Sequence, residues 1–299
     1  HDAGVAIKTA DIAAMLTVDA LEGIVDPYDP RIQEIRPHSG QIDAAANFRQ
    51  ILAGSKLTVH QGSVRIQDAY TLRCLPQIHG ASRMAYDYAR QVIETEINAV
   101  TDNPLIFPDN GDIFSGGNFH GQPVSIAMST LGLAMAEYAN VSERRIERMV
   151  NPQLSGMNGF LTPVEGLNDG YMVAQYAAAA LVSENKILAH PACVDSIPTC
   201  ANQEDHVSFG TIAARNAAQI IDHVQHVLAI ELLCGAQAAD FKNPDKLAPG
   251  TRAAYSLLRS EVPFMDSDRA IYLDTNKVAA QIRDGKYVTA VEAAVGTLK

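Results

Sequence analysis

Cysteine is scarce in this sequence, and its four cysteines form no closely spaced pair. Cys74, Cys193, Cys200 and Cys234 stand among apolar or small residues, and none belongs to a Cys-x-x-Cys motif. This usage predicts buried, reduced thiols, as expected in a cytoplasmic protein. A secretory signal is not recognisable either, which fits the same compartment.

Basic clusters and long apolar runs are also missing. The formal net charge is −11 and Lys and Arg never gather in a run, so no nucleic-acid partner is expected, because phosphates require such a cluster. Charged residues or Gly interrupt each apolar stretch before the ~20 residues that a membrane span requires. With 47% hydrophobic and 19% charged residues, the chain has the composition of a globular protein with a large core.

Several catalytic signatures are absent as well. His223 and His226 have helical spacing, but no nearby acid or Cys completes a ligand set and no His-Glu-x-x-His occurs, so no metal site is expected. A nucleophile elbow for Ser-His-Asp hydrolysis is lacking. The absence of a fixed repeat makes a solenoid binding module a poor interpretation.

The regular pattern that does occur is helical. Apolar spacing and Pro or Gly stops predict helices over 3–24, 41–53, 80–100, 123–150, 170–189 and 206–239, with shorter helices after Pro249 and Pro263. The turn-rich segment 104–120 is the expected place of a hairpin or ordered loop. We therefore predict an all-α fold of long, largely antiparallel helices. Ala-rich faces such as 177–180 predict a central bundle that other subunits complete, because one subunit cannot cover them all.

The segment 67–73 is a first candidate for chemistry. On a helix, Gln67, Tyr70 and Arg73 would share one face. A guanidinium is a natural partner for a substrate carboxylate, and a phenol can transfer a proton. An ordinary solvated helix face accounts for the same spacing.

Two further segments are candidates. Glu204 precedes the longest predicted helix, and an anion at a helix N-terminus could hold an ammonium or an imidazole. A simple capping acid is the alternative. Phe119 stands in the Gly-rich segment 115–123, where it could form an aromatic wall on a tight loop, although a plain turn has the same composition.

Five segments occur in one characteristic order: Gln-Asp-Ala-Tyr-Thr-Leu-Arg-Cys-Leu-Pro-Gln (67–77), Thr-Asp-Asn-Pro-Leu (101–105), Gly-Gly-Asn-Phe-His-Gly-Gln-Pro (116–123), Ser-Glu-Arg-Arg (142–145) and Gln-Glu-Asp-His-Val-Ser (203–208). Together they resemble the aromatic amino-acid lyase family, and within it the histidine ammonia-lyases. The resemblance covers essentially the whole chain.

The resemblance implies an enzyme that removes ammonia from an amino acid without hydrolysis, giving urocanate from L-histidine. Such enzymes use no metal but a methylidene-imidazolone electrophile, which forms by cyclisation of an Ala-Ser-Gly tripeptide. By the matching motifs, Arg73 binds the substrate carboxylate and Tyr70 lies at the reacting centre. Gln67 positions the electrophile and Phe119 lines its pocket, while Glu204 faces the imidazole or the amino group.

Glu204 also bears on the choice of substrate. Phenylalanine lyases usually carry Gln at the matching position, and a desolvated anion suits an imidazole better than a phenyl ring. The resemblance therefore favours histidine, while a lyase or aminomutase acting on tyrosine or phenylalanine stays open.

The sequence departs from the family pattern at one decisive point, because it contains no Ala-Ser-Gly. Leu154-Ser155-Gly156 is similar but lies in the wrong region, since the family places its tripeptide upstream of all the segments above. We expect residues 1–299 to be the C-terminal helical part of a homotetrameric lyase, inactive alone and lacking the N-terminal domain that bears the electrophile. A subunit that pairs with a separate N-terminal chain and a non-catalytic helical scaffold are the alternatives.

Overall fold

The computed structural model describes residues 1–299, and most of its residues are helical. Its helices are α1 (Asp2–Ala20), α2 (Pro30–Glu34), α3 (Ser39–Leu52), α4 (Tyr70–Arg73), α5 (Leu75–Glu96), α6 (Gln122–Val150), α7 (Pro152–Ser155), α8 (Met172–Leu188), α9 (Gly210–Lys242), α10 (Pro249–Glu261), α11 (Ile271–Arg283) and α12 (Lys286–Val295). One antiparallel hairpin joins β1 (Leu105–Phe107) to β2 (Asp112–Phe114). The all-α prediction and the predicted hairpin are confirmed.

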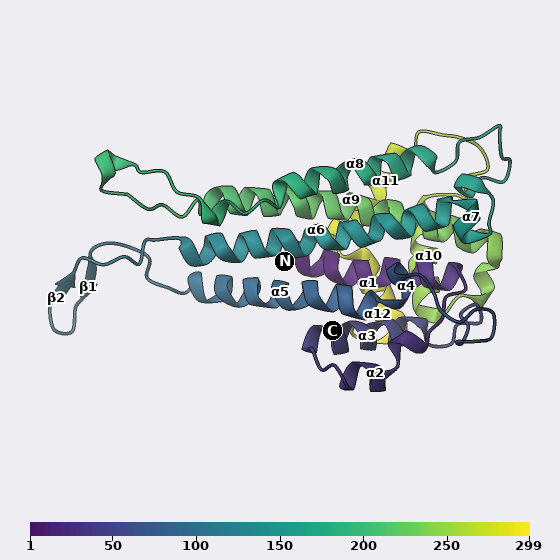
Figure 1. The fold of residues 1–299 in the computed structure, drawn as a ribbon, viewed down its shortest axis with the longest axis horizontal. Helices are drawn as coiled ribbons and strands as arrows, with labels where there is room; N and C mark the ends of the chain where they lie inside the picture. The colour runs from purple at the N-terminus through teal and green to yellow at the C-terminus, as the bar shows by residue number, and fades with distance from the viewer.

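The long helices form an elongated bundle around α1. Figure 1 shows α5, α6, α8 and α9 running along the long axis, with α1 beside α6 and the short C-terminal helices gathered at one end. Every residue of α1 from Thr9 to Ala20 is buried. Most of these residues are Ala or aliphatic, and the small side chains let α6 and α9 approach closely.

Two glycines set the crossing of α3 and α5. A Cβ atom at Gly40 would lie 2.2 Å from the carbonyl oxygen of Gly80, and one at Gly80 would lie 2.4 Å from the amide nitrogen of Gln41. Both distances are shorter than any real contact of that kind. The two helix backbones therefore touch at this point, and only residues without a side chain permit it.

A buried ion pair joins α6 to α9 in the middle of the bundle. Arg145 and Glu231 are both fully buried, with Nε–Oε1 and Nη2–Oε2 distances of 2.5 and 2.8 Å. Hydroxyl groups of Thr17 and Ser142 donate to the same carboxylate, which brings α1 into the network. Arg145 therefore neutralises a buried charge and ties α6 to α9.

Some helix boundaries differ from those predicted. α5 begins at Leu75 rather than near residue 80, because Pro76 fits the first turn of a helix, where no amide hydrogen is needed. α9 begins at Gly210 rather than at residue 206, because Phe209 has a left-handed φ of 50° and cannot continue a right-handed helix.

No helix combines the length and hydropathy that a bilayer crossing requires.

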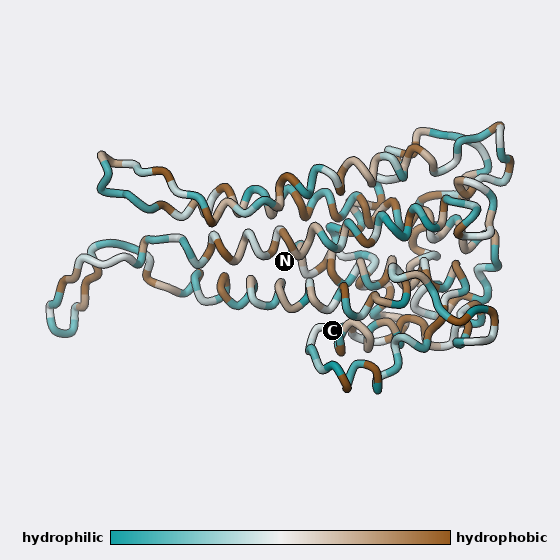
Figure 2. Tube along the Cα trace, viewed as in Figure 1, coloured by the Kyte–Doolittle hydropathy of each residue, from teal (hydrophilic) through white to brown (hydrophobic).

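Two helix pairs extend from the core and end in loops at the same end of the bundle (Figure 1). The loop between α5 and α6 carries the hairpin, and the loop between α8 and α9 carries Glu204. Figure 2 shows apolar segments in both loops. The exposed apolar residues there include Ile106, Ile113 and Val194. We call this end, residues 97–121 and 189–209, the distal end.

The thiols are less uniformly buried than predicted. All four cysteines are free; Cys234 is buried, Cys74 and Cys193 are half-buried, and Cys200 is exposed. The prediction of buried thiols is wrong for Cys200, because it lies in the distal loop rather than in the core.

Candidate active site

The loop that carries Phe119 is fastened to the segment before the hairpin. Asn103 Oδ1 accepts hydrogen bonds from the amide of Gly116 at 2.9 Å and from the hydroxyl of Ser115 at 3.2 Å. The side-chain amide of Asn118 donates to the carbonyl of Val100 at 3.2 Å. These bonds hold the loop while Phe119 itself remains 60% exposed. Phe119 thus lies in a hydrogen-bonded loop, and its exposed ring is free to contact something outside the chain, while its role as an aromatic wall stays a prediction.

The same loop is joined to the loop that carries Glu204. His120 donates through Nε2 to the carbonyl of His206 at 3.0 Å, Gln122 Nε2 donates to the carbonyl of Cys193 at 3.0 Å, and Ser125 Oγ donates to the carbonyl of Ser208 at 2.6 Å. Three of the five family segments, 101–105, 116–123 and 203–208, therefore meet in one hydrogen-bonded unit at the distal end.

Glu204 lies in a turn and not at the N-terminus of the longest helix, so that prediction is wrong. Its carboxylate accepts a hydrogen bond from the hydroxyl of Thr199 through Oε2, and Oε1 accepts none within the chain. The backbones of Thr199 and Glu204 also pair, with N–O distances of 3.0 and 3.3 Å. The carboxylate is thus held by a hydroxyl rather than by the free amides of a helix.

The segment that carries Tyr70 and Arg73 lies elsewhere on the molecule. Of the three candidates, Tyr70 and Arg73 belong to α4, whereas Gln67 precedes the helix in an irregular stretch. The prediction that all three share a helical face is therefore wrong. The reason is the buried Asp68, which accepts hydrogen bonds from the amide of Ile24 at 2.7 Å and from Arg65 Nε at 2.5 Å. These bonds keep the chain irregular up to residue 69.

Arg73 has an unsatisfied guanidinium. It forms no ion pair and no hydrogen bond within the chain; its Cζ lies 4.7 Å from the centre of the Tyr70 ring, and its Nε is buried without a partner. Thr71 Oγ1 and Gln77 Oε1 are buried without a partner as well. Because buried polar groups without partners are costly, their concentration around α4 indicates a place where another molecule or chain supplies the partners.

Within one chain, the two groups of candidate residues are far apart. α5 and α6 are antiparallel, and Tyr138 on α6 donates a hydrogen bond to the carbonyl of His79 on α5. From that point, α6 rises by about 24 Å to Gln122, which contacts the Glu204 loop, at 1.5 Å per residue. Arg73 lies on the other side of the same point, and Figure 1 shows α4 well away from the distal end. A single chain therefore does not bring Arg73 and Glu204 together.

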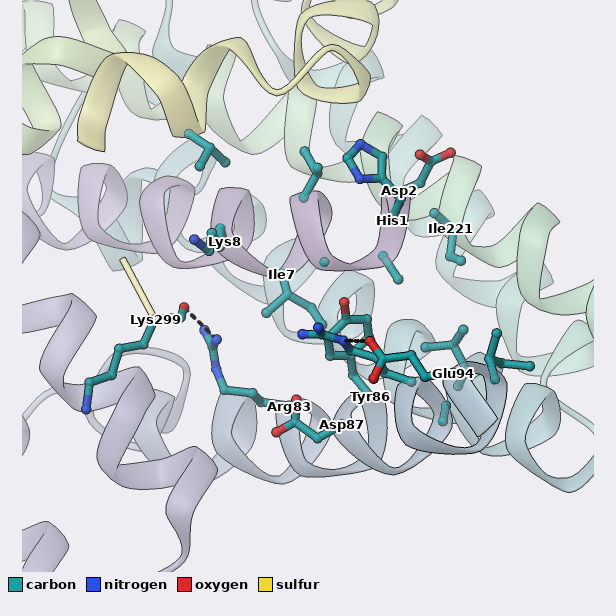
Figure 3. A pocket seen from close by; sticks show the side chains of 18 of the residues that line it. His1, Asp2, Ile7, Lys8, Arg83, Tyr86, Asp87, Glu94, Ile221 and Lys299 are labelled. Carbon is teal, nitrogen blue, oxygen red and sulfur yellow. Dashed lines mark hydrogen bonds and ion pairs between the residues drawn. The ribbon is translucent and has the colours of Figure 1, made fainter. Parts of the chain in front are cut away.

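A cavity of about 1060 Å³ between α1, α5 and the end of the chain contains none of these residues (Figure 3). The cations that line it already have partners: Arg83 bonds to the Lys299 carbonyl, Arg90 to Glu94, and Lys8 to Glu292. Since each of these side-chain cations already has a partner, we do not assign the binding of a substrate carboxylate to this cavity. The chain also contains no group of three or more His, Cys, Asp or Glu residues that could hold a metal ion.

Comparison with known proteins confirms the resemblance. A sequence model of the aromatic amino acid lyase family matches residues 1–260. The chain belongs to the aromatic amino acid lyase family. It is 60% identical to "Histidine ammonia-lyase 2" of Fusobacterium nucleatum over 301 aligned residues, covering all of this chain and 59% of that protein.

Solved structures of the family show the same fold. Histidine ammonia-lyase from Trypanosoma cruzi is 40% identical with a TM-score of 0.91, covering 98% of this chain and 56% of the other. Tyrosine aminomutase from Streptomyces globisporus is 35% identical with a TM-score of 0.96, covering 100% of this chain and 61% of the other. The chain thus spans about three fifths of the length of these family members.

Sequence reasoning missed two residues that organise the distal end. His120 was noticed only as part of a motif, although it links the Phe119 and Glu204 loops. Thr199 was not noticed, although it makes both backbone and side-chain bonds to Glu204. The only feature of the sequence that points to Thr199 is its position directly after Pro198 in a turn-rich stretch. The roles of Gln67, Tyr70, Arg73, Phe119 and Glu204 remain predictions.

Proposed function

We propose that this chain is the C-terminal helical part of a histidine ammonia-lyase, which eliminates ammonia from L-histidine to give urocanate. The observation that carries the proposal is a pair of unsatisfied, opposite charges in family motifs. Arg73 has no anion, and Glu204 keeps one carboxylate oxygen free. An amino acid with a carboxylate at one end and an imidazole at the other complements both. The names of the relatives in Fusobacterium nucleatum and Trypanosoma cruzi support histidine as that amino acid.

Each residue then has a role in the elimination. Arg73 binds the carboxylate, preferably through two parallel hydrogen bonds, and Glu204 accepts a hydrogen bond from the imidazole. Tyr70, 68% exposed and in contact with Arg73, lies next to the Cα–Cβ bond. There the bond from Cα to nitrogen breaks, a base removes a β-proton, and the double bond of urocanate forms. Phe119 and Gln67 line the space beside the amino group.

Members of this family carry a methylidene-imidazolone made from Ala-Ser-Gly. This chain contains no such tripeptide, so we propose that the group comes from residues outside 1–299. The residues present can accommodate the methylidene-imidazolone, because Phe119 and Gln67 are exposed and Thr71 Oγ1 and Gln77 Oε1 lack hydrogen-bond partners. When bound, the group supplies an electrophile for the substrate's amino nitrogen.

We propose that a homotetramer completes the site by placing the distal end of one copy against α4 of another. Charge supports this arrangement. The distal end includes no Lys or Arg and six acidic residues, whereas Arg73 and Arg148 near the opposite end have no anionic partner within the chain. An antiparallel pair of copies would bring these opposite charges together.

A second candidate is an aminomutase or lyase acting on tyrosine, supported by the 0.96 TM-score with tyrosine aminomutase of Streptomyces globisporus. The free oxygen of Glu204 disfavours phenylalanine, because a carboxylate that the substrate desolvates needs a donor that a phenyl ring lacks. A tyrosine phenol can donate to that oxygen as an imidazole can, so the preference for histidine over tyrosine rests on the names of the relatives. A cytoplasmic location remains a prediction from cysteine usage.

The test is to combine residues 1–299 with an N-terminal chain that contains Ala-Ser-Gly, for example the matching part of the Fusobacterium nucleatum relative. Urocanate absorbance should appear with histidine in the mixture and in neither chain alone. The same mixture is assayed with tyrosine and phenylalanine. Turnover of tyrosine but not histidine would favour the aminomutase-like alternative. No turnover by a mixture that assembles stably would contradict the proposal and favour a non-catalytic scaffold.

A further inference from the structure

We propose that Thr199 is the positioning residue for Glu204: its hydroxyl occupies Oε2 and so presents Oε1 to the substrate's imidazole. This inference rests on the proposed function, in which Glu204 meets the imidazole. Thr199 is not expected to touch the substrate, because it acts through the carboxylate.

The geometry around Glu204 leaves Thr199 as its only orienting partner. The hydroxyl of Thr199 donates to Oε2, and no other side chain or amide in the chain hydrogen-bonds the carboxylate. Glu204 is exposed in the single chain, so without this contact the side chain would move among several rotamers. A carboxylate that must meet one ring nitrogen gains from having a single position.

The turn between the two residues brings them together at an energetic cost. Cys200, Ala201 and Asn202 have φ values of 51°, 50° and 71°, so three consecutive residues with a side chain adopt the left-handed region. This conformation is unfavourable for such residues and persists only where surrounding contacts enforce it. The contacts that close the turn are the paired backbones of Thr199 and Glu204. A strained turn that ends on a carboxylate is more readily explained by the position of that carboxylate than by the stability of the loop.

The side chain of Thr199 can be changed without removing the backbone pairing. Thr199 is in an extended conformation, with φ −128° and ψ 177°, which a β-branched Val also favours. Thr199→Val therefore removes the hydroxyl and keeps the shape, while Thr199→Ser keeps the hydroxyl. Glu204→Ala removes the group on which the hydroxyl acts.

The experiment measures kcat/KM for histidine in the complete, active enzyme carrying each variant and the Thr199→Val, Glu204→Ala pair. A hydrogen bond to a charged group predicts a loss of about tenfold for Thr199→Val. Thr199→Ser should restore most of the activity. In the Glu204→Ala background, Thr199→Val should cause no further loss, because its target is already absent. Thermal unfolding of each variant checks that the assembly is intact.

The outcomes separate this inference from the proposed function. The positioning role would be overturned if the two losses multiplied in the double variant. It would also be overturned if Thr199→Ser were as impaired as Thr199→Val. Neither result would contradict the role of Glu204 itself. Unchanged kcat/KM in Glu204→Ala would overturn both the role of Glu204 and this inference. Failure of the complete wild-type enzyme to act on histidine would instead reject the proposed substrate.

Discussion

Two arginines of this chain show how surroundings decide the use of one residue type. Arg145 is fully buried and its charge is neutralised by the bidentate contact with Glu231. Arg73 is half-buried and meets no anion, only the ring of Tyr70. A guanidinium whose charge a carboxylate already neutralises stabilises a fold, whereas one that meets no anion can still bind a carboxylate. The difference makes Arg73 the better candidate for substrate binding.

Replacing Arg73 should therefore impair the reaction. In the complete enzyme, Arg73→Ala should lose ~2–5 kcal/mol of transition-state stabilisation, because the substrate carboxylate is left unpaired. The measurement is kcat/KM for histidine. Arg31→Ala, which removes an arginine that pairs only with Asp29 at the surface, is the control and should keep its activity. An Arg73→Ala variant with wild-type kcat/KM would rule out this residue as the carboxylate clamp.

At the scale of elements, a buried polar cluster ties α1 to α3 and α5. Asp11 lies 2.7 Å from both His79 Nδ1 and Arg83 Nη2, and accepts a hydrogen bond from Asn47 at 2.8 Å. Burial opposes the ionisation of Asp11, but Arg83, His79 and Asn47 together hold its pKa below the usual range. Burial also lowers the pKa of His79, and this effect exceeds the opposing attraction of Asp11. The folded protein therefore keeps an anionic aspartate beside a neutral histidine.

This cluster should make stability depend on pH. The unfolded chain binds a proton at His79 as the pH falls through about 6.5, whereas the folded chain does so only at lower pH. The free energy of unfolding should thus decrease below that pH, by at most about 1.4 kcal/mol per pH unit from this group. Denaturant unfolding at a fixed protein concentration, from about pH 8 to about pH 5 so that the series brackets that pKa, measures the effect.

The control for this pH effect is His79→Gln, which cannot titrate. Its overall stability can differ from that of the wild type, so the informative quantity is the slope of unfolding free energy against pH. The slope should be flatter in the variant across the interval in which His79 titrates in the unfolded chain. Equal slopes in the two proteins would contradict the assignment of a lowered pKa to His79.

For the whole molecule, the outer face of α8 is the clearest sign of assembly. Only Ala174, Ala178 and Asn185 of this helix are buried, although most of its residues are apolar. Val173, Tyr176 and Ile187 are 57, 59 and 75% exposed, along one side of the helix. A monomer with such a stripe would expose a large apolar patch to water, which soluble monomers rarely do.

Charges placed in that stripe should break the assembly. The double substitution Val173→Asp and Tyr176→Asp should lower the molar mass measured by light scattering coupled to size-exclusion chromatography, because an interface would have to bury two carboxylates. Ile35→Asp, at a position that is 86% exposed just after α2, is the matched control and should leave the mass unchanged. An unchanged mass for the α8 variant would show that this face is not an interface.

Local patterns predicted the elements well and the site only in part. The helices that became α1, α3, α6 and α8 were predicted within a few residues, because apolar spacing and Pro or Gly stops act over short distances. The positions of Gln67 and Glu204 were not. Asp68 keeps Gln67 off the helix through a bond to the distant Ile24, and Phe209 delays α9 by turning left-handed. Neither effect leaves a periodic signal.

The sequence by itself determined the helical class, the order of the elements and the membership of the family, because hydrophobic periodicity and ordered motifs are local properties of the chain. Only the tertiary structure decided which motif residues meet. It joined Asn103, Phe119 and Glu204 into one unit and held that unit far from Arg73 along the rigid length of α6. Hydrogen bonds between distant segments and the rise of a long helix set those distances, and neither can be read from the residues that flank each motif.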